Sequence, residues 1–120
     1  MFRLGVIEES LKNPDALEML KPFFFSQRTQ EISGDPYPVW HTNEYHVEND
    51  ALTKLLPLLE RQVKKTWYIH AFNEKELIVV LPGKSFRISP RRDKTWDDMI
   101  AYGEAADVER HYLEGIELNV

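Results

Sequence analysis

The stretch TWYIHAFNEKELIVVLPGKSFRIS, residues 66–89, decides the fold, because it holds the densest run of β-forming residues in the chain. Two turns divide it into three short strands. The second turn is the dipeptide Pro82-Gly83, in which proline presets φ and glycine supplies a positive φ. The middle strand, 77–81, is apolar at every position. It is therefore predicted to be an interior strand that is covered on both faces.

The other two strands of this stretch alternate in character. Successive side chains of a strand point to opposite faces, so Tyr68, His70 and Phe72 are predicted to share one face of the first strand. In the last strand, 85–89, apolar and polar residues alternate. One face of that strand is therefore predicted to meet solvent.

The chain before this stretch alternates between strands and a helix. One strand is predicted over 2–7, and a pair over 23–32 and 39–47 is joined by a Ser-Gly-Asp-Pro loop. Between them, Asn13-Pro14 combines a capping residue with a proline suited to the first helical position. A helix is predicted to begin there and to end at Pro22, because proline cannot continue a helix.

A second helix is predicted over 50–65 from its apolar periodicity. Pro57 lies inside this segment, but the apolar stripe keeps its phase across the proline, so a kink is expected rather than a break. The stripe consists of Leu52, Leu55, Leu56, Leu59 and Val63.

The C-terminal part is predicted to be helical. Thr95 with Asp98 three residues later forms a capping-box pattern, so a third helix is expected to start there and to end at Gly103. A shorter helical turn is expected over 106–113, followed by an extended tail.

This order of elements predicts a single α+β domain over residues 1–120. Its core would be a ferredoxin-like βαββαβ arrangement, extended by the β-meander Thr66–Ser89 and by a C-terminal helical segment. A ferredoxin-like sheet has helices on one face, so the third helix and the tail, or a second subunit, would have to cover the other. A meander-based α+β fold with different connections is the alternative.

Composition places the chain among soluble globular proteins. It has 120 residues, of which 42% are hydrophobic, and no cysteine, which excludes disulfides and thiol catalysis. No apolar run approaches the roughly 20 residues of a membrane helix, and the first ten residues lack a signal-peptide pattern. A cytoplasmic location without membrane association is expected.

Charge is unevenly distributed along a chain of net charge −5. A basic strip follows the Pro-Gly turn, and an acidic segment runs from Asp97 to the C-terminus. The strip is interpreted as a protected sheet edge packed beside acidic residues, and the alternative is a patch for an anionic ligand. Nucleic acid is not expected as a partner, because no RNA-binding motif accompanies the strip. The anion patch would consist of Lys84, Arg87, Arg91 and Arg92.

Motifs for known catalytic chemistry are absent, so no cofactor is predicted. The chain has no GxSxG elbow, Walker loop or HExxH sequence. The weak alternatives use Glu44 and His70 as an acid–base pair, or Glu44, His46 and His70 as a metal site. His41 is predicted to lie on the face of its strand opposite to His46.

Aromatic residues suggest binding rather than catalysis. Trp40, Tyr68 and His70 are the candidates for a ligand site. The favoured hypothesis is a non-catalytic module that binds a protein or a small molecule, as a homodimer through its sheet. The alternatives are an acidic inhibitor or immunity-type protein that binds a basic toxin or nuclease, and a small enzyme that uses a metal or a His/Glu pair.

Overall fold

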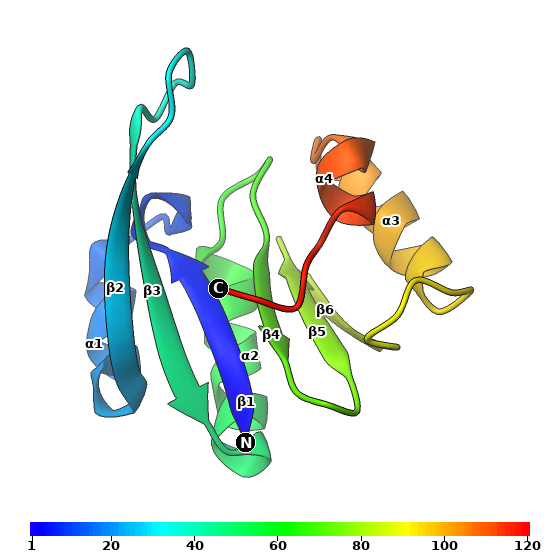
Figure 1. Cartoon of the computed structure of the whole chain (residues 1–120), viewed down its shortest axis with the longest axis horizontal. Helices are drawn as coiled ribbons and strands as arrows, with labels where there is room; N and C mark the ends of the chain where they lie inside the picture. Colours follow the sequence, from blue (N-terminus) through cyan, green and yellow to red (C-terminus); the bar gives the residue numbers. More distant parts are fainter.

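One six-stranded antiparallel sheet runs through the molecule in the order β2-β3-β1-β4-β5-β6 (Figure 1). The computed structural model describes all residues from 1 to 120. The strands are β1 Phe2–Ile7, β2 Phe24–Glu31, β3 Val39–Val47, β4 Ile69–Phe72, β5 Leu77–Leu81 and β6 Lys84–Ile88. The helices are α1 Leu17–Leu20, α2 Asn49–Gln62, α3 Trp96–Ala105 and α4 Arg110–Glu114, with short 3₁₀ turns over 8–10, 14–16 and 21–23.

The first face of the sheet packs against α1 and α2. The predicted apolar stripe of α2 is buried there, together with alternate residues of β1, β3, β4 and β5. Helix α2 continues through Pro57 without interruption. A strong amphipathic pattern therefore keeps the helix intact despite the interior proline.

The second face packs against α3 and α4, but only over β4, β5 and β6 (Figure 1). Every residue of β5 is buried, with Ile78 and Val80 in the first core and Leu77, Val79 and Leu81 in the second. The prediction of an interior strand covered on both faces is confirmed. Strands β2, β3 and β1 have no helix over this face.

Helix α3 begins directly after Thr95 as predicted, but its capping contact and its end differ from the prediction. Thr95 makes no capping hydrogen bond, because its hydroxyl accepts from the Ser89 backbone N–H (3.0 Å). The Asp93 carboxylate instead accepts from the Thr95 backbone N–H (2.8 Å). Gly103 does not end the helix. A Cβ at Gly103 would lie 2.6 Å from Leu113 Cδ1, so glycine allows α3 and α4 to approach closely.

The α+β class is confirmed, but the ferredoxin-like arrangement is not. The meander extends the main sheet, with β5 and β6 continuing beyond β4, so the strand order of the whole sheet differs from that of a four-stranded ferredoxin-like sheet. The first predicted helix is one α-helical turn between 3₁₀ turns. None of the helices combines the length and apolar character that a membrane span requires.

Candidate functional site

A groove lies on the second face of the sheet, where α3 and α4 leave the strands uncovered. One wall is the β2–β3 hairpin, and the other is the C-terminal wall, which consists of lining residues between Asp107 and Val120. The groove has a volume of about 520 Å³. Small-molecule sites typically measure roughly 300–1,000 Å³. The groove is thus large enough for a small organic ligand.

Four side chains from the two strands of the hairpin face the groove, and we call them the hairpin wall. Arg28 lies directly opposite Thr42, and Gln30 lies directly opposite Trp40, so the four form a block on one face of two strands. Thr42 is 6% exposed, and neither its Oγ1 nor Trp40 Nε1 has a hydrogen-bond partner. Buried polar groups are nearly always paired. These two groups therefore mark a place where a partner is missing.

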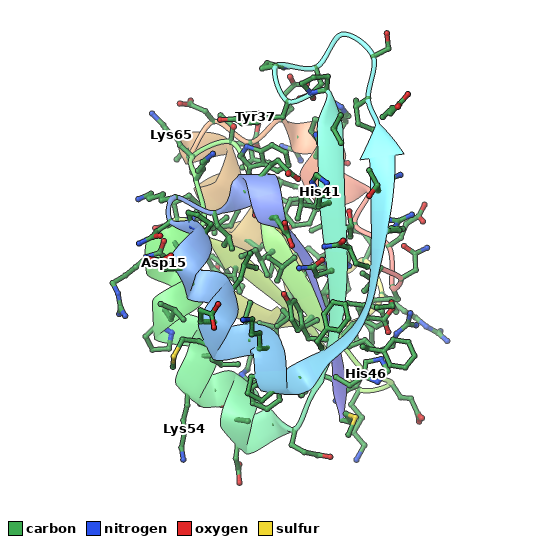
Figure 2. The ribbon with its side chains drawn as sticks, turned by 90° about the vertical axis from the view of Figure 1, so that its left-hand side faces the viewer. Asp15, Tyr37, His41, His46, Lys54 and Lys65 are labelled. Atoms are coloured by element: carbon green, nitrogen blue, oxygen red, sulfur yellow. The ribbon has the colours of Figure 1, made fainter.

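A cluster of aromatic rings lines one part of the groove. Trp40 and Trp67 meet edge to face with ring centroids 5.2 Å apart, and Tyr37 meets Trp67 at 5.7 Å. Lys64 fixes Tyr37, because its Nζ lies 4.7 Å from the ring centroid and donates to the Tyr37 hydroxyl (3.2 Å). Figure 2 shows Tyr37 near the hairpin end of the molecule. This cluster offers apolar ring surfaces to a ligand.

The C-terminal tail crosses the sheet and forms part of the opposite wall (Figure 1). His70 Nε2 donates to the Asn119 carbonyl (2.8 Å). Gly5 permits this crossing, because a Cβ there would lie 3.0 Å from His70 Cε1 and 3.2 Å from Val120 Cγ2. Burial lowers the pKa of His70, so the ring is neutral at pH 7 and holds the tail through its N–H.

Two residues at the rim of the groove have a left-handed backbone. Thr66 (φ 77°) and Asp107 (φ 64°) are the two non-glycine residues with positive φ, and both line the groove. The Thr66 N–H donates to the Ala106 carbonyl (3.2 Å). Asp107 follows the C-cap of α3, where a left-handed residue commonly ends a helix. For Thr66 such a conformation costs about 1–3 kcal/mol, and strained residues of this kind cluster at functional sites. The backbone therefore points to the same region as the unpaired side chains.

All three candidates for a ligand site, Trp40, Tyr68 and His70, line this groove. They come from β3 and from the start of the meander, which the sheet brings together on either side of β1. Burial raises the pKa of the Tyr68 hydroxyl, and the nearby Glu117 carboxylate raises it further. That a ligand binds to these residues stays a prediction.

The three metal candidates do not converge. His46 Nε2 lies 2.6 Å from Glu44 Oε2, but Glu44 also accepts from Arg3 Nε (2.9 Å) and Nη2 (3.0 Å). The hydrogen bond from Arg3 is the main reason why the pKa of Glu44 is lowered. His70 is on β4, with Gly5 of β1 between it and Glu44. The structure therefore brings Glu44 and His46 together but places neither beside His70, so the acid–base pair is not assembled either.

A cluster of Glu8, Glu9 and His41 on the first face was not predicted from the sequence. Each residue offers one ligand atom, and these atoms lie within 4.8 Å of one another. Glu9 accepts from the His41 backbone N–H (2.6 Å) and pairs with the ring Nδ1 (2.8 Å). This contact raises the pKa of His41. Figure 2 shows His41 and His46 towards opposite ends of β3, and they lie on opposite faces as predicted.

The basic strip does not form one surface. Arg87 faces α2, where it pairs with Glu76 (2.6 Å) and donates to Asn49 and Thr53. Lys84 is on the other face of β6, over the rings of Phe86 and Tyr102. Arg92 pairs with Glu114 (3.4 Å), whereas Arg91 makes no ion pair. Most of these cations are therefore bound to groups of the protein itself.

The acidic C-terminal segment is also bound in part to cations of the same chain. Asp107 pairs with Lys65 (2.8 Å), and Arg110 binds both Glu104 and Glu114. That this segment binds a basic toxin or nuclease stays a prediction.

No protein-family model matches the chain, and searches of curated proteins and of solved structures found no match either. The geometry of the groove is therefore the guide to function.

Proposed function

We propose that this protein is a non-catalytic binding module that holds a small organic ligand in the groove. One observation carries the proposal: the Thr42 hydroxyl and the Trp40 indole N–H are inaccessible to solvent, lack partners and lie in the wall of a groove of about 520 Å³. A buried polar group without a partner costs about 1–3 kcal/mol. A ligand that supplies the missing hydrogen bonds would remove that cost, once a rotation of the Trp40 and Thr42 side chains brings these two atoms to the surface of the groove.

Two placements support binding rather than acid–base catalysis. The His70 Nε2–H is bound to the Asn119 carbonyl, and the Glu44 carboxylate is bound by Arg3. Glu44 does not line the groove that contains His70, so a substrate in the groove would not meet both groups. The aromatic rings and unpaired donors of the groove instead suit recognition of a ligand.

Indole N–H signals in a ¹H–¹⁵N NMR spectrum test this proposal. The chain has three tryptophans. Trp40 and Trp67 line the groove, whereas the Trp96 N–H is bound to the Ser89 carbonyl (2.8 Å) under α3. In a screen of small aromatic fragments we expect shifts of the Trp40 and Trp67 signals, with Trp96 as the internal control.

A Trp40→Phe variant assigns the Trp40 signal, and it should lower the affinity for every fragment that binds. A screen in which no fragment moves the Trp40 signal, or in which all three indoles move equally, would contradict the proposal.

Self-association through the edge strand β2 is a second candidate, and one observation favours it. Phe24 and Phe25, at the start of this edge strand, are 53% and 60% exposed. Phe25 stacks on His46 with ring centroids 4.0 Å apart, which holds it at the surface. Analytical ultracentrifugation should then show a dimer that Phe25→Asp dissociates, and a monomer at all concentrations would rule this candidate out.

A further inference from the structure

We infer that the ligand of the groove is a monocarboxylate with a flat apolar body, and that its carboxylate binds to Arg28, Thr42 and Trp40. This inference rests on the proposed function and specifies the chemistry of the same site. Three properties of the groove carry it: the kind of hydrogen bonds that the hairpin wall lacks, the free guanidinium and the charge of the opposite wall.

The unpaired groups of the hairpin wall require a hydrogen-bond acceptor. An indole N–H can only donate, so the free Trp40 Nε1 needs an acceptor atom. The Thr42 hydroxyl can also donate, and it is buried without a partner on the same face. An oxygen-rich group of the ligand can accept a hydrogen bond from both. An ammonium group can only donate, so it cannot bind the Trp40 N–H, and its positive charge is repelled by Arg28.

Arg28 supplies the positive charge that distinguishes a carboxylate from a neutral acceptor. Arg28 is on β2 directly opposite Thr42 of β3 and lines the groove, and its side chain makes no ion pair or hydrogen bond within the protein. Its planar guanidinium matches the two oxygens of a carboxylate. The chain has several carboxylates on the opposite wall of the groove, yet none of them binds Arg28.

The opposite wall limits the charge of the ligand. The ionised side chains that line the groove are four carboxylates, against the single guanidinium of Arg28. A dianion such as a phosphate would be repelled by these acids, whereas one negative charge held at the hairpin wall is matched by Arg28. The rest of the ligand would then lie against the rings of Trp67 and Tyr68 and must be apolar. Three of the four acids, Asp107, Glu109 and Glu117, are on the opposite wall, and Asp35 is in the loop of the hairpin.

Three probes with the same phenylethyl group separate these requirements: 3-phenylpropionate, its neutral amide and 2-phenylethylamine. Titrations of the full chain at low salt would follow the Trp40 indole signal. We expect 3-phenylpropionate to bind about 10-fold or more tightly than the amide, because hydrogen bonds to a charged group are stronger than neutral ones. The amine should bind most weakly.

Two variants and a control test the assigned residues. Arg28→Gln should reduce the affinity for 3-phenylpropionate to that for the amide, and Thr42→Val should weaken both probes. Arg61→Gln is the matched control, because Arg61 is an exposed arginine of α2 without an ion pair and lies outside the groove. It should leave all affinities unchanged.

The inference and the proposed function fail in different ways. If the amide binds as tightly as the acid, if the amine binds best, or if inorganic phosphate displaces the acid, the inference is overturned while the groove remains a binding site. It is also overturned if none of the three probes moves the Trp40 signal. The proposed function is contradicted as well only if no fragment moves the Trp40 signal or if all three indole signals move equally.

Discussion

The two halves of the second face of the sheet are built in opposite ways. Over β4, β5 and β6 the face is apolar, and α3 and α4 cover it with buried side chains such as Met99 and Leu113. Over β1, β3 and β2 no helix covers the face, and the strands present Arg28, Thr42 and Trp40 to a groove. One half is thus a closed core, and the other is an open surface whose polar groups are incompletely paired.

The largest expected effect lies in the covered half. Leu113 is fully buried and contacts the position of Gly103, so Leu113→Ala opens a cavity between α4 and α3. We expect the free energy of unfolding to fall by about 2–5 kcal/mol, as for other large-to-small changes in a core. Urea denaturation measures it. A loss below about 1 kcal/mol, the usual range of surface changes, would mean that α4 is not part of a packed core.

The boundary between the two halves should respond to pH through His70. Burial lowers the pKa of its ring, so the unfolded chain binds more protons than the folded chain as the pH falls below about 6.5. His70 therefore makes the protein less stable on acidification. His41 affects stability in the opposite direction. Its hydrogen bond to Glu9 raises its pKa, so the stability that it contributes at low pH is lost as the pH rises through that raised value.

Urea midpoints at pH 5, 6 and 7 check this difference. His70→Gln should reduce the loss of stability between pH 7 and pH 5, and its side-chain amide can still donate to the Asn119 carbonyl. His41→Gln should increase the loss over the same range. If both variants change the pH dependence in the same direction, the assignment of the two environments is wrong.

A smaller gain is expected at the rim of the open half. Thr66 has a φ of 77°, which glycine adopts without strain, so Thr66→Gly should raise the free energy of unfolding by about 1 kcal/mol. Thermal or urea denaturation measures this gain. Gly34 and Gly83 already have positive φ, so alanine there should have the opposite effect and serves as the control. A loss of stability in Thr66→Gly would show that its side chain, rather than its backbone, matters at the rim.

Much of the covered half could be predicted from the sequence, because local patterns determine it. The uniform apolar run of 77–81 indicated a strand between two cores, and strand alternation placed Tyr68, His70 and Phe72 on one face. On the first face of the sheet, the apolar stripe of α2 was also predicted correctly despite Pro57. These are properties of a single element, so no knowledge of its neighbours is needed.

The open half could be predicted only in part, because its site depends on contacts between distant segments. Trp40, Tyr68 and His70 were chosen as ligand candidates for their chemistry, and the sheet brings them around one groove. Arg28 and Thr42 carried no motif, since their pairing depends on the register of β2 and β3. The crossing of the tail over Gly5 had no local signal either.

The change Thr42→Val tests the central claim most directly, because valine keeps the shape of threonine and removes only the unpaired hydroxyl. Urea denaturation and titration with 3-phenylpropionate would be performed on the same sample. We predict that the free energy of unfolding stays equal or rises by about 0.5–1 kcal/mol, since an unsatisfied buried group is removed, while binding weakens. A loss of more than about 1 kcal/mol, the value of a typical hydrogen bond, together with unchanged binding, would show that the hydroxyl serves the fold and not a ligand.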